Sequence, residues 1–137
     1  MIISVCIPCH NRTYNLKRTL PRILGAAASS PPVEIVVLDY NSPDDLAEYM
    51  AQIDSPDGVS IVHRRFLGRN YYHMAHARNL SVLAASGEYV IITCADAWFA
   101  SGFFESVRET LGERPHKFLE GTRYTGIFVC QRQEFID

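Results

Sequence analysis

The stretch Ser86-Gly-Glu-Tyr-Val-Ile-Ile-Thr-Cys-Ala-Asp-Ala-Trp98 decides the fold of this chain. Residues 89–94 form a short apolar run, rich in β-branched side chains and preceded by a glycine turn, which predicts a strand covered on both faces. Asp96 follows the strand, where open α/β sheets bind ligands. We therefore expect Asp96 to meet a positive group, such as a metal ion carried with a phosphorylated ligand. The alternative is that Asp96 caps the next helix.

Composition limits the class of protein. The chain has 137 residues, 47% of them hydrophobic, which predicts one domain over residues 1–137. The net charge of -2 provides no broad positive field, so we expect no nucleic-acid partner. No apolar run approaches the about 20 residues that span a bilayer, and no signal peptide is evident. We expect a cytoplasmic protein without a transmembrane segment, whose four cysteines are buried or half-buried thiols.

Strand-like and helix-like segments alternate along the chain. We expect strands over residues 2–8, 33–38, 59–63, 89–94, 117–122 and 126–132. We expect helices from Asn11 or Thr13 to residue 27, from a Ser42 cap to residue 53, and over residues 74–85 and 103–112, with a last turn at 134–137. Residues 64–73 are expected to be a loop. Because parallel strands need crossover helices, the alternation predicts an α/β, doubly wound, mostly parallel sheet.

Polar clusters follow three of these strands and should converge at one edge of the sheet. They are Cys9-His-Asn-Arg12, Asp39-Tyr-Asn-Ser42 and Cys94-Ala-Asp96. Arg12, Arg69 and Arg78 are cations that would balance a diphosphate. Asp39 and Asn41 offer acceptors for a base or a ribose.

Four ordered motifs carry a resemblance to a known family. They are Ile3-Ser-Val-Cys-Ile-Pro-Cys-His-Asn-Arg12, Val36-Val-Leu-Asp-Tyr-Asn-Ser-Pro-Asp44, Ala77-Arg-Asn79 and Ser86-Gly-Glu-Tyr-Val90. Together they resemble the nucleotide-binding half of family 2 glycosyltransferases, which have the GT-A fold. The resemblance covers nearly the whole chain, and four motifs in order are far more specific than any one of them.

This resemblance implies a ligand, a cofactor and a set of site residues. The ligand would be UDP or a UDP-sugar, with Mn²⁺ or Mg²⁺ on its diphosphate. By position, Pro8, His10 and Arg12 would lie near the base or phosphates, and Asp39 and Tyr40 at the uridine. Asp96, beside Ala95, would hold the metal. The predicted binding residues are Pro8, His10, Arg12, Asp39, Tyr40, Asn41, Arg69, Arg78, Ala95 and Asp96.

The sequence also departs from the family pattern. Cys94 stands where an acid usually opens the Asp-x-Asp motif, and Ala97 where another Asp often follows it. Since a thiol is a poor ligand for Mg²⁺ or Mn²⁺, we expect weak metal binding through Asp96 and the diphosphate. Family members continue past a segment resembling residues 126–136 into an acceptor half that carries a catalytic base. This sequence stops at Asp137, so we expect the chain alone to bind the donor and to transfer sugar poorly.

Other functions stay open at this level. The domain could be a nucleotide-sugar-binding module without chemistry, or a subunit completed by a partner chain or by a second copy. Cys6-Ile-Pro-Cys-His10 also fits the Cys-x-x-Cys of a thiol redox protein that uses Cys6 and Cys9. The same residues match the attachment motif of c-type haem, but that attachment would need export, for which no signal is evident.

Overall fold

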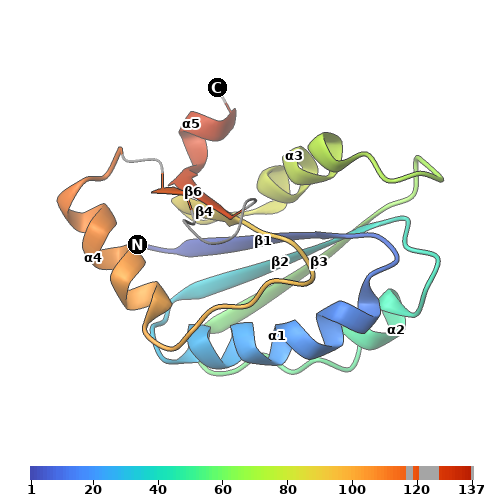
Figure 1. Ribbon diagram of the computed structural model, residues 1–137, viewed down its shortest axis with the longest axis horizontal. Helices are drawn as coiled ribbons and strands as arrows, with labels where there is room; N and C mark the ends of the chain where they lie inside the picture. Colours follow the sequence, from blue (N-terminus) through green and yellow to red (C-terminus); the bar gives the residue numbers. More distant parts are fainter. Residues whose placement is uncertain (117–118, 121–126, 137) are drawn as a thin grey trace.

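The computed structural model describes residues 1–116, 119–120 and 127–136, which form an open sheet with helices packed against it (Figure 1). The strands are β1 (Ile3–Cys9), β2 (Val33–Tyr40), β3 (Val59–Phe66), β4 (Tyr89–Ile92), β5 (Leu119–Glu120) and β6 (Phe128–Gln131). The helices are α1 (Thr13–Ala28), α2 (Leu46–Met50), α3 (Met74–Ala84), α4 (Phe103–Glu113) and α5 (Arg132–Ile136).

The sheet has the strand order β3-β2-β1-β4-β6-β5. The pairs β1–β2, β2–β3 and β1–β4 are parallel, whereas β6 runs antiparallel to both β4 and β5. The prediction of a doubly wound, mostly parallel α/β sheet is confirmed. The chain moves outward from β1 to β3 and then returns to place β4 on the other side of β1. This reversal creates a switch point between β1 and β4, where such sheets bind ligands.

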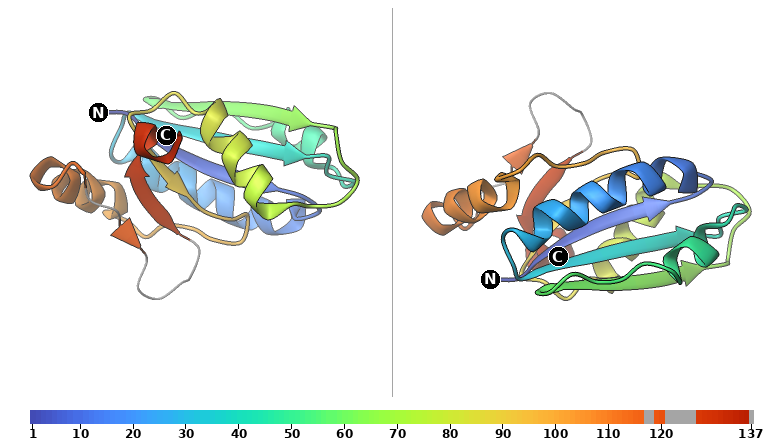
Figure 2. Two further views of the ribbon diagram at one scale, coloured as in Figure 1. Left: turned by 90° about the horizontal axis from the view of Figure 1, so that it is seen from above. Right: turned by 90° about the horizontal axis from the view of Figure 1, so that it is seen from below.

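Helices cover both faces of the sheet, as the views from above and below show (Figure 2). The larger core cluster contains Val5, Ile7 and Ile35 with Leu20 of α1 and Phe104 of α4. A second cluster, on the other face, packs alternate strand residues against α3. β1, β2 and β4 are buried along their whole length, which explains why they read as nearly continuous apolar runs.

The parallel strands differ in extent from the predicted ones. β3 continues to Phe66, so the expectation that the loop begins at Arg64 is wrong. Residues Arg64, Arg65 and Phe66 pair in register with Leu38, Asp39 and Tyr40 of β2. β2 itself runs two residues beyond the predicted end, to Tyr40, and β4 ends at Ile92.

The starts of α1 and α2 also differ from prediction. α2 begins at Leu46 with Asp45 at its N-cap, so Ser42 does not cap it. The Ser42 hydroxyl instead accepts a hydrogen bond from the Asn11 N–H (2.8 Å) and donates one to Asp44. Ser42 therefore joins the loops that follow β1 and β2.

Arg12 occupies the N-cap of α1 without a side-chain bond, so neither Asn11 nor Thr13 caps this helix with its side chain. The N–H of the buried Thr13 donates to the Asp44 carboxylate of the neighbouring loop at 3.0 Å. The free N–H groups at a helix start favour such a negative partner.

The C-terminal part agrees in order with the prediction. β5 and β6 lie within the predicted strands 117–122 and 126–132, but residues 117–118 and 121–126 fall outside the described ones. α5 occupies most of the expected last turn at 134–137, of which Asp137 also lies outside the described residues. No helix in the described part of the chain has the length and apolar character needed to cross a bilayer.

A buried polar network lies at the end of the sheet where β1, β2 and β4 begin. Glu34, only 5% exposed, accepts hydrogen bonds from the Ser4 hydroxyl and from the Ser86 N–H (2.8 Å) and hydroxyl (2.7 Å). The Gly87 N–H donates to the Ser4 oxygen at 2.9 Å. Burial acts to raise the pKa of Glu34, but the hydrogen bonds outweigh it and hold this pKa below its usual value.

Candidate functional site

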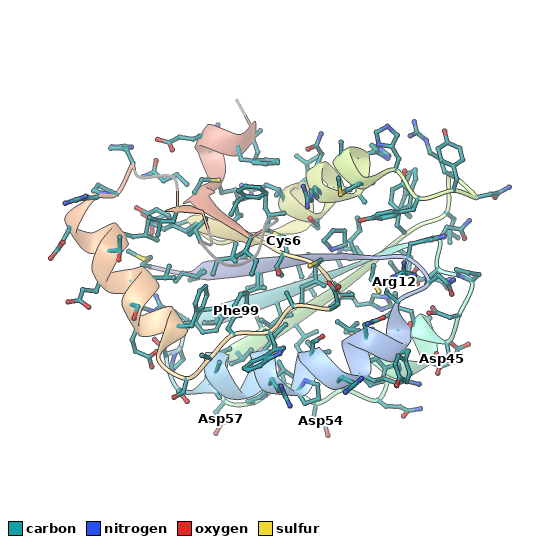
Figure 3. All side chains as sticks on the ribbon, in the orientation of Figure 1. Cys6, Arg12, Asp45, Asp54, Asp57 and Phe99 are labelled. Atoms are coloured by element: carbon teal, nitrogen blue, oxygen red, sulfur yellow. The ribbon has the colours of Figure 1, made fainter. Side chains whose placement is uncertain are left out.

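A cavity of about 190 Å³ opens at the switch point, beside the carboxyl ends of β1 and β4. Its walls come from the end of β1 and the loop after it, from α3 and the loop before it, and from the segment after β4. The lining residues are Pro8, His10, Arg12, Tyr72, Met74, Arg78, Thr93, Cys94, Ala95 and Asp96. Figure 3 shows Arg12 where the chain leaves β1 and enters α1.

The structure brings together part of the predicted binding set. Pro8, His10, Arg12, Arg78, Ala95 and Asp96 line this cavity, while Asp39, Tyr40, Asn41 and Arg69 do not. Tyr72, Met74 and Thr93 also line it and were not predicted. Tyr72 stands in the basic and aromatic stretch before α3, and that composition is the only signal that would have pointed to it.

One wall of the cavity is aromatic. The His10 Nδ1 lies 2.7 Å from the Tyr40 carbonyl oxygen. Because a carbonyl oxygen only accepts, Nδ1 carries the hydrogen, and Nε2 is the acceptor of the neutral ring. The His10 and Tyr72 rings are nearly parallel, at 14°, with centroids 5.8 Å apart. Such flat surfaces suit a planar ligand group.

Two cations face the cavity with different surroundings. Arg12 is exposed, and its guanidinium donates to the neighbouring Asn11 carbonyl at 2.9 Å. Arg78 is half-buried, and its Nε is fully buried without a hydrogen-bond partner among the described residues. Its guanidinium lies 5.9 Å from the centroid of the Phe128 ring. A guanidinium with a buried N–H that lacks a partner is costly unless an acceptor such as an anion completes it.

Asp39 lies inside the sheet instead of lining the cavity. Its side chain is 1% exposed, with Oδ1 accepting the Ser42 N–H at 2.7 Å and Oδ2 lying 2.9 Å from Arg65 Nε. His63 Nε2 is 3.9 Å from the same oxygen. Burial lowers the pKa of His63, although Asp39 acts in the opposite direction. A base could reach Asp39 only if Arg65 or another covering group moved.

Tyr40, Asn41 and Arg69 support the region behind the cavity. Tyr40 is fully buried, and its hydroxyl lies 2.8 Å from His76 Nδ1. The Asn41 amide donates to the Arg69 carbonyl at 2.8 Å, which ties the loop after β3 to the end of β2. The Arg69 guanidinium lies over the Tyr71 ring, 5.8 Å from its centroid. Direct ligand contacts of these three residues stay predictions.

Asp96 is an exposed carboxylate in the segment after β4. Gly102 occupies the N-cap of α4, so the alternative that Asp96 caps this helix is wrong. Burial, the hydrogen bond to Asp96 and the charge of Asp96 raise the pKa of Cys94 to about 11. The Cys94 thiol is therefore protonated near neutral pH and is not a metal ligand in that form.

The described residues contain no group of three or more His, Cys, Asp or Glu side chains arranged to hold a metal ion. Mg²⁺ is commonly held by one or two carboxylates together with substrate phosphates and water. Asp96 offers one such carboxylate. The side chains present therefore suit a hard cation only when a diphosphate supplies further oxygens.

A buried threonine fixes the segment that carries Asp96. The Thr19 hydroxyl of α1 donates to the Ala95 carbonyl at 2.6 Å, and Thr19 is 6% exposed. We did not predict this contact. Its only sequence signal is that Thr19 falls between Leu16, Leu20 and Ile23 on the apolar side of α1.

The thiol redox alternative is wrong. Cys6 belongs to the core cluster on the α3 face, whereas Cys9 belongs to the cluster on the α1 face. Residues three apart on a strand are separated by about 10 Å, beyond the about 7 Å limit for disulfide formation. Both thiols are buried, and burial raises their pKa values to about 12. The same burial leaves no room for haem attachment.

Comparisons with known proteins agree with this geometry. Residues 4–130 match the family model described as Glycosyl transferase family 2. The fold is similar to that of S. aureus TarS 1-349, with a TM-score of 0.80, 14% identity, and coverage of 100% of this chain and 49% of that chain. The TarS 1-349 complex with UDP-GlcNAc matches with a TM-score of 0.71, 18% identity, and coverage of 86% and 32%.

A further similar structure is the mannosyltransferase PcManGT from Pyrobaculum calidifontis in complex with GDP-Man and Mn²⁺. Its TM-score is 0.71 at 20% identity, with coverage of 96% of this chain and 44% of that chain. Likeness at these identities shows the fold alone, which is GT-A. The chain spans half or less of the length of these proteins.

Proposed function

The chain belongs to glycosyl transferase family 2, and from that membership we propose that its cavity binds a nucleoside diphosphate sugar, with a UDP-sugar as the donor. The observation that carries the proposal is the convergence of Pro8, His10, Arg12, Arg78 and Asp96 on one cavity at the switch point. The TarS structures in complex with UDP and UDP-GlcNAc support the choice of uracil.

The contacts of the proposed complex follow from the walls of the cavity. Arg12 and Arg78 pair with the diphosphate, since guanidinium groups bind phosphate oxygens in bidentate fashion. Asp96 would hold a Mn²⁺ or Mg²⁺ ion together with the diphosphate, and such an ion would supply charge neutralisation of the leaving group. The base would pack against the wall that contains His10 and Tyr72. Asp39 would reach the uridine only after Arg65 turns away, and the buried Tyr40 only after the rings packed against it, such as Phe66 and Tyr72, move.

We further propose that the bound donor gives its sugar to an acceptor, with UDP as the leaving group. Fixed positive groups aimed at the diphosphate stabilise the charge that develops as the glycosidic bond breaks. The general base is unassigned. A nucleotide-sugar-binding module without chemistry, a subunit completed by a partner chain, and a homo-oligomer are alternative forms of the proposal. We also propose that residues 1–137 form a single domain and that the protein is cytoplasmic.

Calorimetry with UDP, GDP and ADP, each with and without Mn²⁺, tests the binding proposal. We expect saturable UDP binding with a Kd below about 1 mM, equivalent to at least about 4 kcal/mol. GDP and ADP should bind less tightly, because their purine bases are larger than uracil. A folded protein that shows no UDP binding at millimolar ligand would contradict the proposal.

Replacing Cys94 by aspartate should strengthen the effect of Mn²⁺ on UDP affinity about tenfold, because a second carboxylate would join Asp96 at the cation. Cys94→Asn is the matched control, since it has nearly the same size without the charge. Asp96→Ala should remove whatever Mn²⁺ enhancement the natural protein has. Equal Mn²⁺ dependence in the Asp and Asn variants of Cys94 would show that the cation does not lie beside this position.

A further inference from the structure

A second cavity, of about 170 Å³, lies between α1 and the segment that follows β4. Its lining residues are Asn15, Arg18, Thr19, Arg22, Asp96 and Trp98. Asp96 is the one residue that lines both this cavity and the proposed nucleotide cavity. A group bound in the second cavity would therefore lie beside the donor diphosphate.

The second cavity carries a net positive charge, because two arginines and one carboxylate line it. Arg18 and Arg22 are one helical turn apart and exposed, and neither is within 4.0 Å of a carboxylate in the described part of the chain. Lys17, on the same helix, does have such a partner, because its Nζ lies 2.6 Å from Asp45. Like charges four residues apart destabilise a helix slightly. The arrangement is therefore better suited to an external anion than to helix stability.

The Trp98 ring packs against the guanidinium of Arg22. The Trp98 side chain is 50% exposed, and the Arg22 guanidinium lies 4.6 Å from the ring centroid. A guanidinium on an aromatic face gains from cation–π attraction and keeps its in-plane N–H groups available. Those N–H groups match the paired oxygens of a phosphate or carboxylate. The exposed part of the indole offers an apolar surface for a sugar ring.

We propose that the second cavity binds the anionic group, a phosphate or a carboxylate, of an acidic sugar acceptor. The assignment as an acceptor site rests on the proposed function, because it follows from the shared wall at Asp96. Arg18 and Arg22 hold the anionic group, and Trp98 contacts the attached sugar or polyol. Binding there would bring acceptor and donor together, which is the main requirement for group transfer between two substrates. The Asp96 carboxylate repels the bound anion when the charge of Asp96 is not neutralised.

Trp98 provides a direct readout because it is the one tryptophan of the chain. We would titrate the natural protein, saturated with UDP and Mn²⁺, with glycerol 3-phosphate and with glucuronate, and follow the fluorescence and indole N–H signal of Trp98. Glycerol, glucose and inorganic phosphate are the control ligands. We expect saturable changes with the two anionic compounds, no change with the neutral ones and weaker binding of free phosphate.

The double variant Arg18→Gln/Arg22→Gln should weaken the binding of the two anionic compounds about tenfold or more, since it removes both guanidinium partners. Lys17→Gln on the same helix is the matched control for lost charge and should leave their affinity unchanged. Thermal unfolding and UDP calorimetry on each variant would show that the fold and the nucleotide cavity are intact.

Four outcomes would overturn the acceptor site. The first three are equal responses to glycerol and glycerol 3-phosphate, equal affinity in the double variant, and free phosphate binding as tightly as its ester. A parallel titration without UDP provides a fourth test. A response seen without UDP but absent in the UDP-saturated protein would also overturn the acceptor site, because the cavity would then belong to the nucleotide phosphates. Absence of UDP binding with the anion response intact would contradict the proposed function but support the anion site.

Discussion

Replacing Glu34 by alanine is expected to lower the free energy of unfolding by about 3 kcal/mol. The carboxylate accepts hydrogen bonds from Ser4 and Ser86, and hydrogen bonds to charged groups contribute about 1.5–3 kcal/mol each. The Ser4 hydroxyl is fully buried, so the variant would leave it without its acceptor. The network joins the starts of β1 and β2 to the turn before β4, and its loss should weaken the sheet as a whole.

Urea unfolding of Glu34→Ala and of Glu109→Ala measures this difference. Glu109 is exposed on α4, so its removal should change stability by less than about 0.5 kcal/mol. Glu34→Gln keeps the shape of the side chain and removes its charge. Equal unfolding midpoints for the two alanine variants would refute the role assigned to the network.

The same network predicts a pH dependence. Because the folded pKa of Glu34 lies below its usual 4.5, the ionised form is favoured in the folded state. This contribution to stability is fully present above pH 4.5 and is lost as the pH falls through the lowered folded pKa. The stability difference between the natural protein and Glu34→Gln should therefore shrink in acid and stay constant near neutral pH.

The sequence predicts some strands better than others, for a physical reason. β1, β2 and β4 are covered on both faces, so nearly every residue in them is apolar and the pattern is plain. The end of β3 lies at the edge of the sheet and contains exposed Arg64 and Arg65. It is a strand because β2 supplies a backbone partner in register. This pairing depends on the tertiary structure and cannot be predicted from the local sequence.

In the candidate site, too, some residues could be placed from the sequence and others could not. Residues that directly follow a strand, such as His10, could be placed at the cavity from the order of elements alone. Asp39 could not, because β2 runs on to Tyr40 and encloses Asp39 beside Arg65. The second cavity depends on the approach of α1 to the segment after β4, marked by the hydrogen bond between Thr19 and Ala95. These residues are far apart in sequence, and no local pattern indicates their contact.

Replacing Arg78 by glutamine is expected to weaken UDP binding about 30- to 100-fold, which corresponds to about 2–3 kcal/mol. Arg78 is half-buried in the cavity wall, and its buried Nε has no hydrogen-bond partner among the described residues. A diphosphate oxygen would supply that partner in a setting partly shielded from water, where the ion pair is strong. Glutamine keeps good helix propensity, so α3 should remain intact.

Calorimetry on a matched set of variants separates this role from general electrostatics. Arg12→Gln should weaken UDP binding less than Arg78→Gln, because Arg12 is exposed and already donates to the Asn11 carbonyl. Arg64→Gln removes the same charge outside the cavity and should leave UDP affinity unchanged. Uridine has no phosphate, so its weak affinity should be the same in the natural protein and in Arg78→Gln. If Arg78→Gln weakened uridine and UDP equally, Arg78 would be shaping the cavity and not pairing with the diphosphate.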